Sequence, residues 1–269
     1  MLSNSTYNGL KSFIWGIAND CLVDVYDVGD YRKIILPMFV IRRLDAVLEG
    51  THKKVIEKKK QLMDLGLKDN MDEALFQVAG QAFVNKAEFT LKDLKGVSSK
   101  KRLKDDFITY LDGFSSNVQN IIDKFRIRNE IDRLSEQDRL GMIIEKFVDP
   151  KYNFSNKPVL NEDGTVKIEA LDNHSMGTLF EEVIRMFNEE TNVTDAGRHF
   201  TPRDIVELIA DLAFVPIQDK INSTSYRIYD GAVGYYVIIM TVVNSLIKSR
   251  VLVLLQNIIT LKNNNLCVV

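Results

Sequence analysis

The residues best suited to hold a ligand lie in one stretch of the last third of the chain, Ala196 to Asp204. Thr201 can cap a helix through its hydroxyl group, and Pro202 suits the first helical position, where an N–H would have no partner. Apolar residues then recur at helical spacing from Ile205 to Leu212. Such a helix begins with free backbone N–H groups and the positive end of its dipole, which favour a carboxylate or a phosphate. A well-capped helix that binds nothing is the simpler interpretation of this stretch alone.

A second stretch of candidate ligand-binding residues follows after a short connection. The residues from Tyr226 to Tyr229 predict a short strand, and Asp230, Gly231 and Gly234 come directly after it. A strand, an acidic residue and a glycine turn are typical of the start of a nucleotide-cofactor site in a doubly wound sheet. Glycine lets the backbone approach the ligand closely, beyond the carboxyl end of the strand. The two stretches together therefore favour a nucleotide-like cofactor.

Both stretches resemble the modification subunit of type I restriction–modification systems, a family of S-adenosylmethionine-dependent adenine-N6 DNA methyltransferases. Three earlier segments are similar to that family in the same order, namely Ile14 to Asp20, Tyr31 to Asp45 and Gly177 to Glu182. The combination of segments is specific, although each one alone is not. The resemblance implies a mainly α N-terminal helical domain, followed by the start of an incomplete α/β Rossmann-like methyltransferase domain.

The resemblance also implies a cofactor site and partners. The residues at the helix start would lie over the methionine end of S-adenosylmethionine, and those after the strand would line the same cofactor. The implied cofactor-binding residues are Arg198, His199, Phe200, Thr201, Pro202, Arg203, Asp230, Gly231 and Gly234. The implied partners are a specificity subunit, a second modification subunit and a restriction subunit, with DNA bound by the full complex in the cytoplasm. Neither a metal ion nor a membrane is implied.

The chain departs from the family pattern in two ways. The family holds the adenine amine with the Asn side chain and the Pro carbonyl of an Asn-Pro-Pro-aromatic segment, but no Asn-Pro dipeptide occurs among the 269 residues. Tyr235 and Tyr236 follow Gly234 in place of further loop glycines, which makes loop conformations with positive φ costly. We therefore expect a chain truncated inside its catalytic domain, inactive alone, with no catalytic residue to assign. Binding of S-adenosylmethionine is expected to be weak or absent, and a frameshift is our hypothesis for the atypical tail from about Tyr235.

Two other interpretations of the chain stay open. One is a non-catalytic helical assembly or decoy protein that docks on a specificity subunit or on DNA. The other is a helical protein whose capped helix binds nothing. For the truncated domain, strand edges left uncovered by an incomplete sheet predict either self-association or a tail folded back on the helical domain.

Composition and net charge limit how the protein could contact nucleic acid. The net charge of −2 gives no global basic field, so any contact with DNA must come from local patches or from a partner. We predict a helical domain over residues 1–165 and the start of the methyltransferase domain over residues 166–269. Neither Cys21 nor Cys267 has metal-ligand neighbours in the sequence, and the apolar run that begins at Tyr235 is too short to span a bilayer.

Apolar periodicity and capping residues predict the helices of the first domain. One helix covers Leu10 to Cys21, and a second covers Tyr31 to Leu48, with Pro37 at a start, break or kink and an extension to about Leu65. Four more helices are predicted over Leu75 to Phe83 after an Asn70 cap, Ser98 to Leu111, Val118 to Phe125, and Leu140 to Phe147 capped by Ser135 with Asp138. A hairpin over Val159–Leu160 and Val166–Ile168 then precedes an amphipathic helix from Met176 to Phe187.

Two basic runs need separate interpretations. Ser98 to Lys104 is the densest basic patch, and it could contact DNA phosphates, but no aromatic residue interleaves with it. An exposed helix start is therefore the preferred interpretation. The run Glu57 to Lys60 is most simply a solvated helix face. Trp15 is expected in the core or at a subunit contact, and no role is assigned to His52 or His174.

Overall fold

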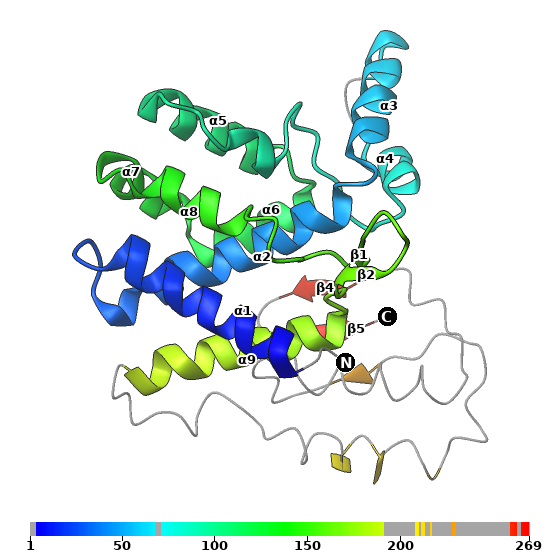
Figure 1. Ribbon diagram of the computed structural model, residues 1–269. Helices are drawn as coiled ribbons and strands as arrows, with labels where there is room; N and C mark the ends of the chain where they lie inside the picture. The colour runs from blue at the N-terminus through cyan, green and yellow to red at the C-terminus, as the bar shows by residue number, and fades with distance from the viewer. Residues whose placement is uncertain are drawn as a thin grey trace. The chain divides into compact units, whose positions relative to one another are not determined.

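A computed structural model of the protein describes residues 4–67, 71–190, 208–209, 211–212, 216, 228–229, 259–262 and 265–268. Contacts divide the chain into two compact units, Met1–Asn192 and Val193–Val269. In the described part of the first unit, nine α-helices surround one core, and a short exposed hairpin lies outside that core (Figure 1). The predicted mainly α character of the N-terminal region is thus confirmed.

The first segments of the chain form two helices joined by short turns. Helix α1 (Asn4–Ile17) continues into a π-helical turn, η1 (Ala18–Leu22), and the 3₁₀ turn η2 (Val28–Asp30) leads to helix α2 (Arg32–Leu48). All the apolar positions predicted to face inward between residues 10 and 21 are buried, which confirms the first helix.

Helix α2 continues through its internal proline. Pro37 has no N–H to donate to the carbonyl group of Lys33, yet the helix extends to Leu48. α2 packs against α6, α8 and α9, and Pro37 is buried; packing of this kind supplies most of a helix's stability in proteins, so the loss of one backbone bond is tolerated. The buried apolar side chains of α2 include Ile34, Ile35, Met38, Phe39 and Ile41.

The next helices differ from the prediction at their ends. One continuous helix to about Leu65 is wrong, because the chain turns at Gly50 and a separate helix, α3 (His52–Asp64), follows. Helix α4 (Asp72–Ala79) ends earlier than the predicted Phe83. Gly80 causes this early end, since it adopts a left-handed conformation with φ of 63° and donates its N–H to Phe76. The predicted cap Asn70 lies outside the described residues.

The middle of the unit contains a 3₁₀ turn, η3 (Leu91–Leu94), and helices α5 (Lys100–Asp112) and α6 (Ser116–Phe125). α5 begins at Lys100 rather than at the predicted Ser98, and its cap is Ser99, whose hydroxyl accepts the N–H of Arg102 at 3.4 Å. α6 agrees with the prediction, and its inward residues are Val118 and Ile122.

Helix α7 (Arg128–Glu136) was not predicted from the sequence. Ser135 lies inside α7, so the prediction that Ser135 caps the following helix is wrong. That following helix, α8 (Arg139–Phe147), begins after Asp138, which has a positive φ of 59°. Its predicted inward residues are all buried, namely Leu140, Ile143, Ile144 and Phe147.

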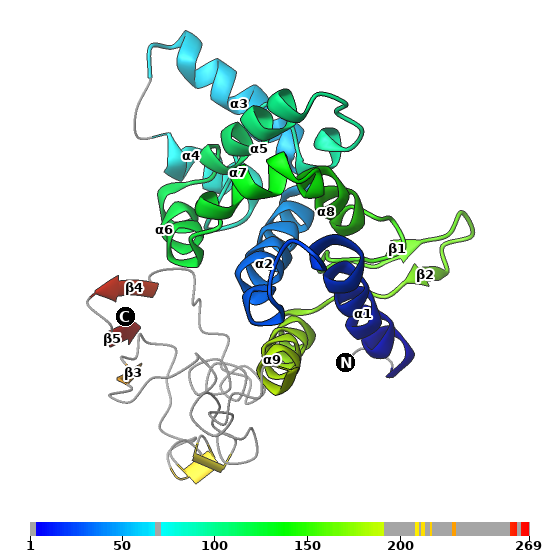
Figure 2. The ribbon, with the colours of Figure 1, turned by 90° about the vertical axis from the view of Figure 1, so that its left-hand side faces the viewer.

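The last segments of the unit are a hairpin and a long helix. Strands β1 (Val159–Leu160) and β2 (Val166–Ile168) pair antiparallel as predicted, and Figure 2 shows this hairpin extending beyond the helices. Helix α9 (Asn173–Glu190) packs against α1 and α2 through Leu179, Val183 and Phe187. The predicted amphipathic helix is confirmed, and it belongs by its contacts to the unit Met1–Asn192. The predicted domain boundary at residues 165–166 stays a prediction.

Aromatic rings fill the space where α1, α2, α8 and the segment before the hairpin meet. The rings of Phe13 and Phe147 meet edge to face with centroids 5.9 Å apart, and Phe39 meets Phe154 in the same way at 5.4 Å. Phe39, Phe147 and Phe154 are fully buried. Edge-to-face pairs are favourable beyond the area that they bury, so this cluster joins segments that are far apart in the sequence.

The second unit is described only in short segments. Strands β3 (Ile228–Tyr229), β4 (Ile259–Lys262) and β5 (Asn265–Val268) form an antiparallel sheet in the order β3-β5-β4. Tyr229 lies opposite Cys267, and Lys262 lies opposite Asn265. The predicted strand is therefore confirmed at its two described residues, Ile228 and Tyr229.

Candidate functional site

The predicted cofactor-binding residues, from Arg198 to Arg203 together with Asp230, Gly231 and Gly234, lie outside the described residues. The structure describes what borders them in the chain. Strand β3 ends at Tyr229, immediately before Asp230. Of the helix predicted after Thr201, the four described positions 208, 209, 211 and 212 are helical, and the apolar side chains among them are exposed.

Helix α9 is the last described helix before the predicted cofactor segment in the sequence. Its start is capped by Asp172, whose carboxylate accepts the N–H of Ser175 at 2.6 Å, while the Asp172 carbonyl accepts the N–H of Met176 at 2.9 Å. This cap was not predicted from the sequence, although Asp172 precedes the apolar positions at the spacing that a cap requires. This cap defines where α9 begins against the core.

Arg43 holds the start of α9 to helix α2. Its Nη1 donates to the carbonyl oxygens of Phe154 and Leu171, each at 2.6 Å, and its Nη2 donates to Oδ1 of Asn173 at 2.9 Å. Carbonyl groups buried away from water need a donor, and a planar guanidinium can serve several at once. One side chain thus ties the segments on both sides of the β1–β2 hairpin to α2.

Arg42 forms the second buried contact of α2, within a polar cluster made by Arg42, Asp45 and Tyr110. Arg42 donates to Asp45 at 2.9 Å through Nη1 and to the carbonyl of Phe147 at 3.0 Å through Nε. The other oxygen of Asp45 accepts the hydroxyl of Tyr110 at 3.0 Å and the N–H of Leu91 at 3.1 Å. This cluster joins α2 to η3, α5 and α8, and every polar group of Asp45 in it has a partner.

Burial sets the protonation of these groups. It raises the pKa of the Asp45 carboxyl, while the charge of Arg42 and the two donors oppose that change. Burial and the neighbouring Asp45 also raise the pKa of Tyr110 well above its usual value, so the phenol keeps the proton that it donates. Burial lowers the pKa of Arg43 and the charge of Asp172 opposes this, but a guanidinium stays charged in proteins.

These arginines are residues that sequence reasoning missed. Both belong to the segment Tyr31 to Asp45 that carries the family resemblance, yet no role was assigned to them. The available signal was the occurrence of Arg42, Arg43 and Asp45 in a helix whose other residues are mainly apolar. Charged residues at such positions are almost never fully buried unless they are paired, so they predict partners, but not which ones.

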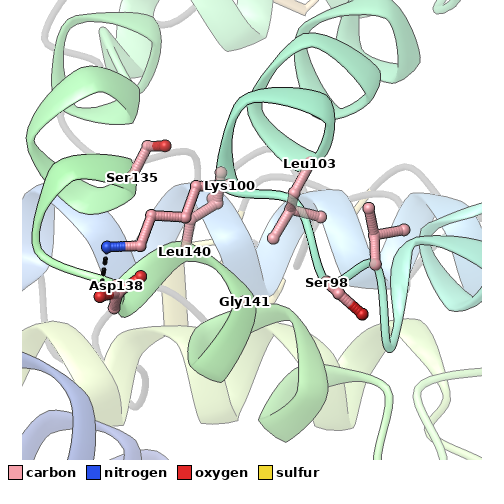
Figure 3. Close-up of a pocket in the computed structure, with 8 residues that line it drawn as sticks. Ser98, Lys100, Leu103, Ser135, Asp138, Leu140 and Gly141 are labelled. Carbon is pink, nitrogen blue, oxygen red and sulfur yellow. Dashed lines mark ion pairs between the residues drawn. The ribbon is translucent and has the colours of Figure 1, made fainter.

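The densest basic patch borders a small pocket of about 130 Å³ (Figure 3). Its walls are Val97, Ser98, Lys100, Leu103, Ser135, Asp138, Leu140 and Gly141. Lys100 forms an ion pair with Asp138 at its edge. The hydroxyl groups of Ser98 and Ser135 have no histidine beside them in the pocket wall to activate them as nucleophiles. The pocket therefore presents no catalytic arrangement.

Cys21, His52 and Trp15 are packed in the core or beside it, where their contacts are structural. The Cys21 thiol is fully buried, and burial raises its pKa to about 11, which keeps it from reacting as a thiolate. His52, to which no role was assigned, is also buried, with Nε2 3.0 Å from the carbonyl of Ala87. Trp15 packs on Phe187 with ring centroids 5.7 Å apart, which agrees with its expected place beside the core.

The described residues contain neither a cluster of metal ligands nor a membrane-spanning helix. Among these residues, no three histidine, cysteine or acidic side chains come together as metal ligands. No helix in this part of the chain has the length and apolar character needed to cross a bilayer.

Comparison with protein families identifies two consecutive parts of the chain. Residues 10–147 match the HsdM N-terminal domain, and residues 171–253 match the N-6 DNA methylase family. The order of the two matches agrees with the helical unit and with the cofactor segment predicted after it. The chain therefore belongs to the DNA methyltransferase (modification) subunits of type I restriction–modification systems. Comparisons with curated proteins and with solved structures found no match.

Proposed function

We propose that the chain acts as the modification subunit of a type I restriction–modification system, whose chemistry is methyl transfer from S-adenosylmethionine to adenine N6 in DNA. The observation that carries this proposal is the succession of the two family matches, over residues 10–147 and 171–253. We expect it to work in the cytoplasm beside its DNA substrate. Its partners would be a specificity subunit, a second modification subunit and a restriction subunit.

The proposed cofactor residues have distinct tasks. The N–H groups at the helix start after Thr201, with Arg198 and Arg203, would bind the carboxylate of the cofactor. Asp230 follows strand β3 directly, and a carboxylate at the carboxyl end of a strand suits a ribose hydroxyl pair. The cofactor supplies the electrophilic methyl group when bound. Tyr235 and Tyr236 are the residues that fit this site least well, because they replace glycines where the backbone should approach the ligand.

Calorimetric titration with S-adenosylmethionine tests the cofactor site. We expect binding no tighter than about 1 mM, which corresponds to only about 4 kcal/mol. A micromolar dissociation constant that is lost in Thr201→Ala or Asp230→Ala would instead mean an intact cofactor site and would contradict the proposed weak binding.

We further propose that this chain alone transfers no methyl group to DNA. The adenine amine is a poor nucleophile, because its lone pair is delocalised into the ring, and it needs acceptors that hold its hydrogens. The Asn-Pro pair that supplies them in the family does not occur in this sequence. Incorporation of labelled methyl groups into duplex DNA above background by the purified chain would refute the proposal.

A second candidate function is a non-catalytic helical module that assembles with a specificity subunit. The observation that favours it is the completeness of the core between Leu10 and Phe187, which includes residues from every α-helix of the first unit. Size-exclusion chromatography of the chain mixed with a specificity subunit distinguishes the two functions when combined with the titration. Co-elution without any saturable cofactor binding supports the helical module, whereas saturable binding, even near ~1 mM, supports the methyltransferase.

A further inference from the structure

We propose that the exposed face of helix α3 contacts the phosphate backbone of duplex DNA through Lys54 and Lys58, with Lys53 beside them. The inference rests on the proposed function, because that function makes DNA the substrate. It adds a surface that neither the sequence analysis nor the family comparison assigns.

Positive charge is concentrated on α3. The helix has five lysines and two acidic residues between His52 and Asp64, although the whole chain has a net charge of −2. Its apolar side is buried through Val55, Ile56 and Leu62. Of the lysines on the remaining surface, Lys53, Lys54 and Lys60 are exposed, and Lys58 and Lys59 are half-buried.

Ion pairing leaves part of this charge free. Lys60 pairs with Glu88 at 3.2 Å, and Lys59 donates to the carbonyl of Lys86 at 2.9 Å. Within the described residues, no acidic group pairs with Lys53, Lys54 or Lys58 at 4 Å or less. Lys53 still contributes to the lowered pKa of Asp93, after the hydrogen bonds from Thr90. Lys54, which is exposed, and Lys58, which is half-buried, therefore remain as the cations available to a ligand.

Most of the denser basic patch at the start of α5 is ion-paired by comparison, and among the described residues Lys101 alone of its cations has no acidic partner at 4 Å or less. Lys100 pairs with Asp138, Arg102 with Asp106 at 3.3 Å, and Lys104 with Asp132 at 2.6 Å. Each pair would have to open before its cation could bind a phosphate. The better site for a polyanion is therefore α3, even though α5 has the denser run in the sequence.

The geometry of α3 suits a regular array of phosphates. Lys54 and Lys58 are one turn apart, which corresponds to an advance of about 6 Å along the helix. Phosphates advance about 3.4 Å per nucleotide along one strand of a duplex, so the two flexible lysine stems can reach neighbouring phosphates. Figure 1 shows α3 projecting from the helical unit beside α4, with which it packs. Contacts with DNA phosphates also gain binding free energy from the release of counterions, whereas exposed ion pairs with a protein partner contribute little.

The test is binding of the purified full chain to a labelled duplex, followed by fluorescence anisotropy over a series of salt concentrations. The double variant Lys54→Gln, Lys58→Gln should bind on the order of 10- to 100-fold more weakly near 0.1 M salt. Its plot of log affinity against log salt should be shallower by about 2, since each lost phosphate contact removes about 0.9. Lys54→Arg, Lys58→Arg should keep the wild-type affinity and slope.

The matched control is Lys100→Gln, Lys104→Gln on α5, which should leave both quantities unchanged. The inference is overturned if the wild-type chain does not bind the duplex at low salt, or if the α3 and α5 variants lose affinity equally. Circular dichroism of each variant shows whether it is folded. Because S-adenosylmethionine titration tests the cofactor site independently, failure of the proposed function would be seen separately from failure of this inference.

Discussion

Helices α2 and α3 are neighbours in the chain, and both are rich in basic residues, but they use them in opposite ways. α2 buries Arg42 and Arg43, which bind carbonyl groups and Asp45 in the core. α3 keeps its lysines at the surface. The residue types match these uses, because the planar guanidinium satisfies several acceptors at once, while the ammonium on a flexible stem is best hydrated. A basic residue in an apolar run therefore predicts a structural contact, and a run of lysines predicts a surface.

The largest loss of unfolding free energy is expected when a buried arginine of α2 is removed. Arg42→Met leaves the Asp45 carboxylate buried without its cation and the Phe147 carbonyl without its donor. Losing one partner of a buried ion pair costs about 3–5 kcal/mol. Urea unfolding measures this loss, with Lys54→Met on α3 as the matched control, which should stay within about 0.5 kcal/mol of wild type. A loss below that of an exposed residue would show that the cluster is not needed for stability.

A smaller effect is expected from changing only the shape of a buried cation. Arg43→Lys keeps the charge, but one ammonium cannot serve the carbonyls of Phe154 and Leu171 and the side chain of Asn173 together. A buried acceptor left unpaired costs about 1–3 kcal/mol. The unfolding free energy should fall by that amount, whereas Lys58→Arg on α3 should be neutral. Equal stability of Arg43→Lys and wild type would mean that the fork geometry does not matter.

A smaller, pH-dependent loss of stability is expected from the buried Cys21 thiol. The folded-state pKa of Cys21 is about 11, against an ordinary value of 9.0. As the pH rises, the unfolded chain therefore loses this thiol proton first, so the stability from Cys21 is complete below about pH 9 and is lost toward pH 11. At pH 10 the loss is on the order of 1 kcal/mol. Unfolding at pH 8 and pH 10 measures it, and a Cys21→Ala variant should lack this part of the pH dependence.

The smallest effect on stability is expected at the surface pair of α5. Lys100 and Asp138 are both well exposed, with side-chain accessibilities of 57% and 63%, and such pairs contribute about 0–1 kcal/mol. Thermal unfolding of Lys100→Gln should therefore differ little from that of wild type. A destabilisation comparable to that of Arg42→Met would mean that the pocket beside this pair has a structural role.

Periodicity was enough to predict the helices whose apolar positions form a continuous stripe, as in α1 and α9. It missed α7, because charged residues separate its few apolar positions, such as Ile131 and Leu134. It also extended the second helix too far, since a lysine-rich continuation satisfies the same spacing as a separate helix.

The polar contacts of the core could not be predicted, because they join residues that are distant in the sequence. Arg43 and the Leu171 carbonyl are 128 positions apart, and Arg42 and the Phe147 carbonyl are 105 apart. No local pattern encodes such a pairing. For the cofactor site, the sequence supplied the residues from Arg198 to Asp230 through the resemblance, and they stay a prediction that the binding experiments above address.

Hydrogen bonds join the chain segments that enter and leave the β1–β2 hairpin. Leu171 donates its N–H to the carbonyl of Ser155 at 2.9 Å, Asn153 donates to the carbonyl of Glu169 at 3.0 Å, and Arg43 binds both flanks. The two ends of this excursion are therefore held together independently of what lies between them. Lengthening a loop whose ends are already fixed costs little, about 0.6 kcal/mol for each doubling. The turn beyond Asn161 is thus a place where evolution or an engineer could insert a new sequence without disturbing the helical core.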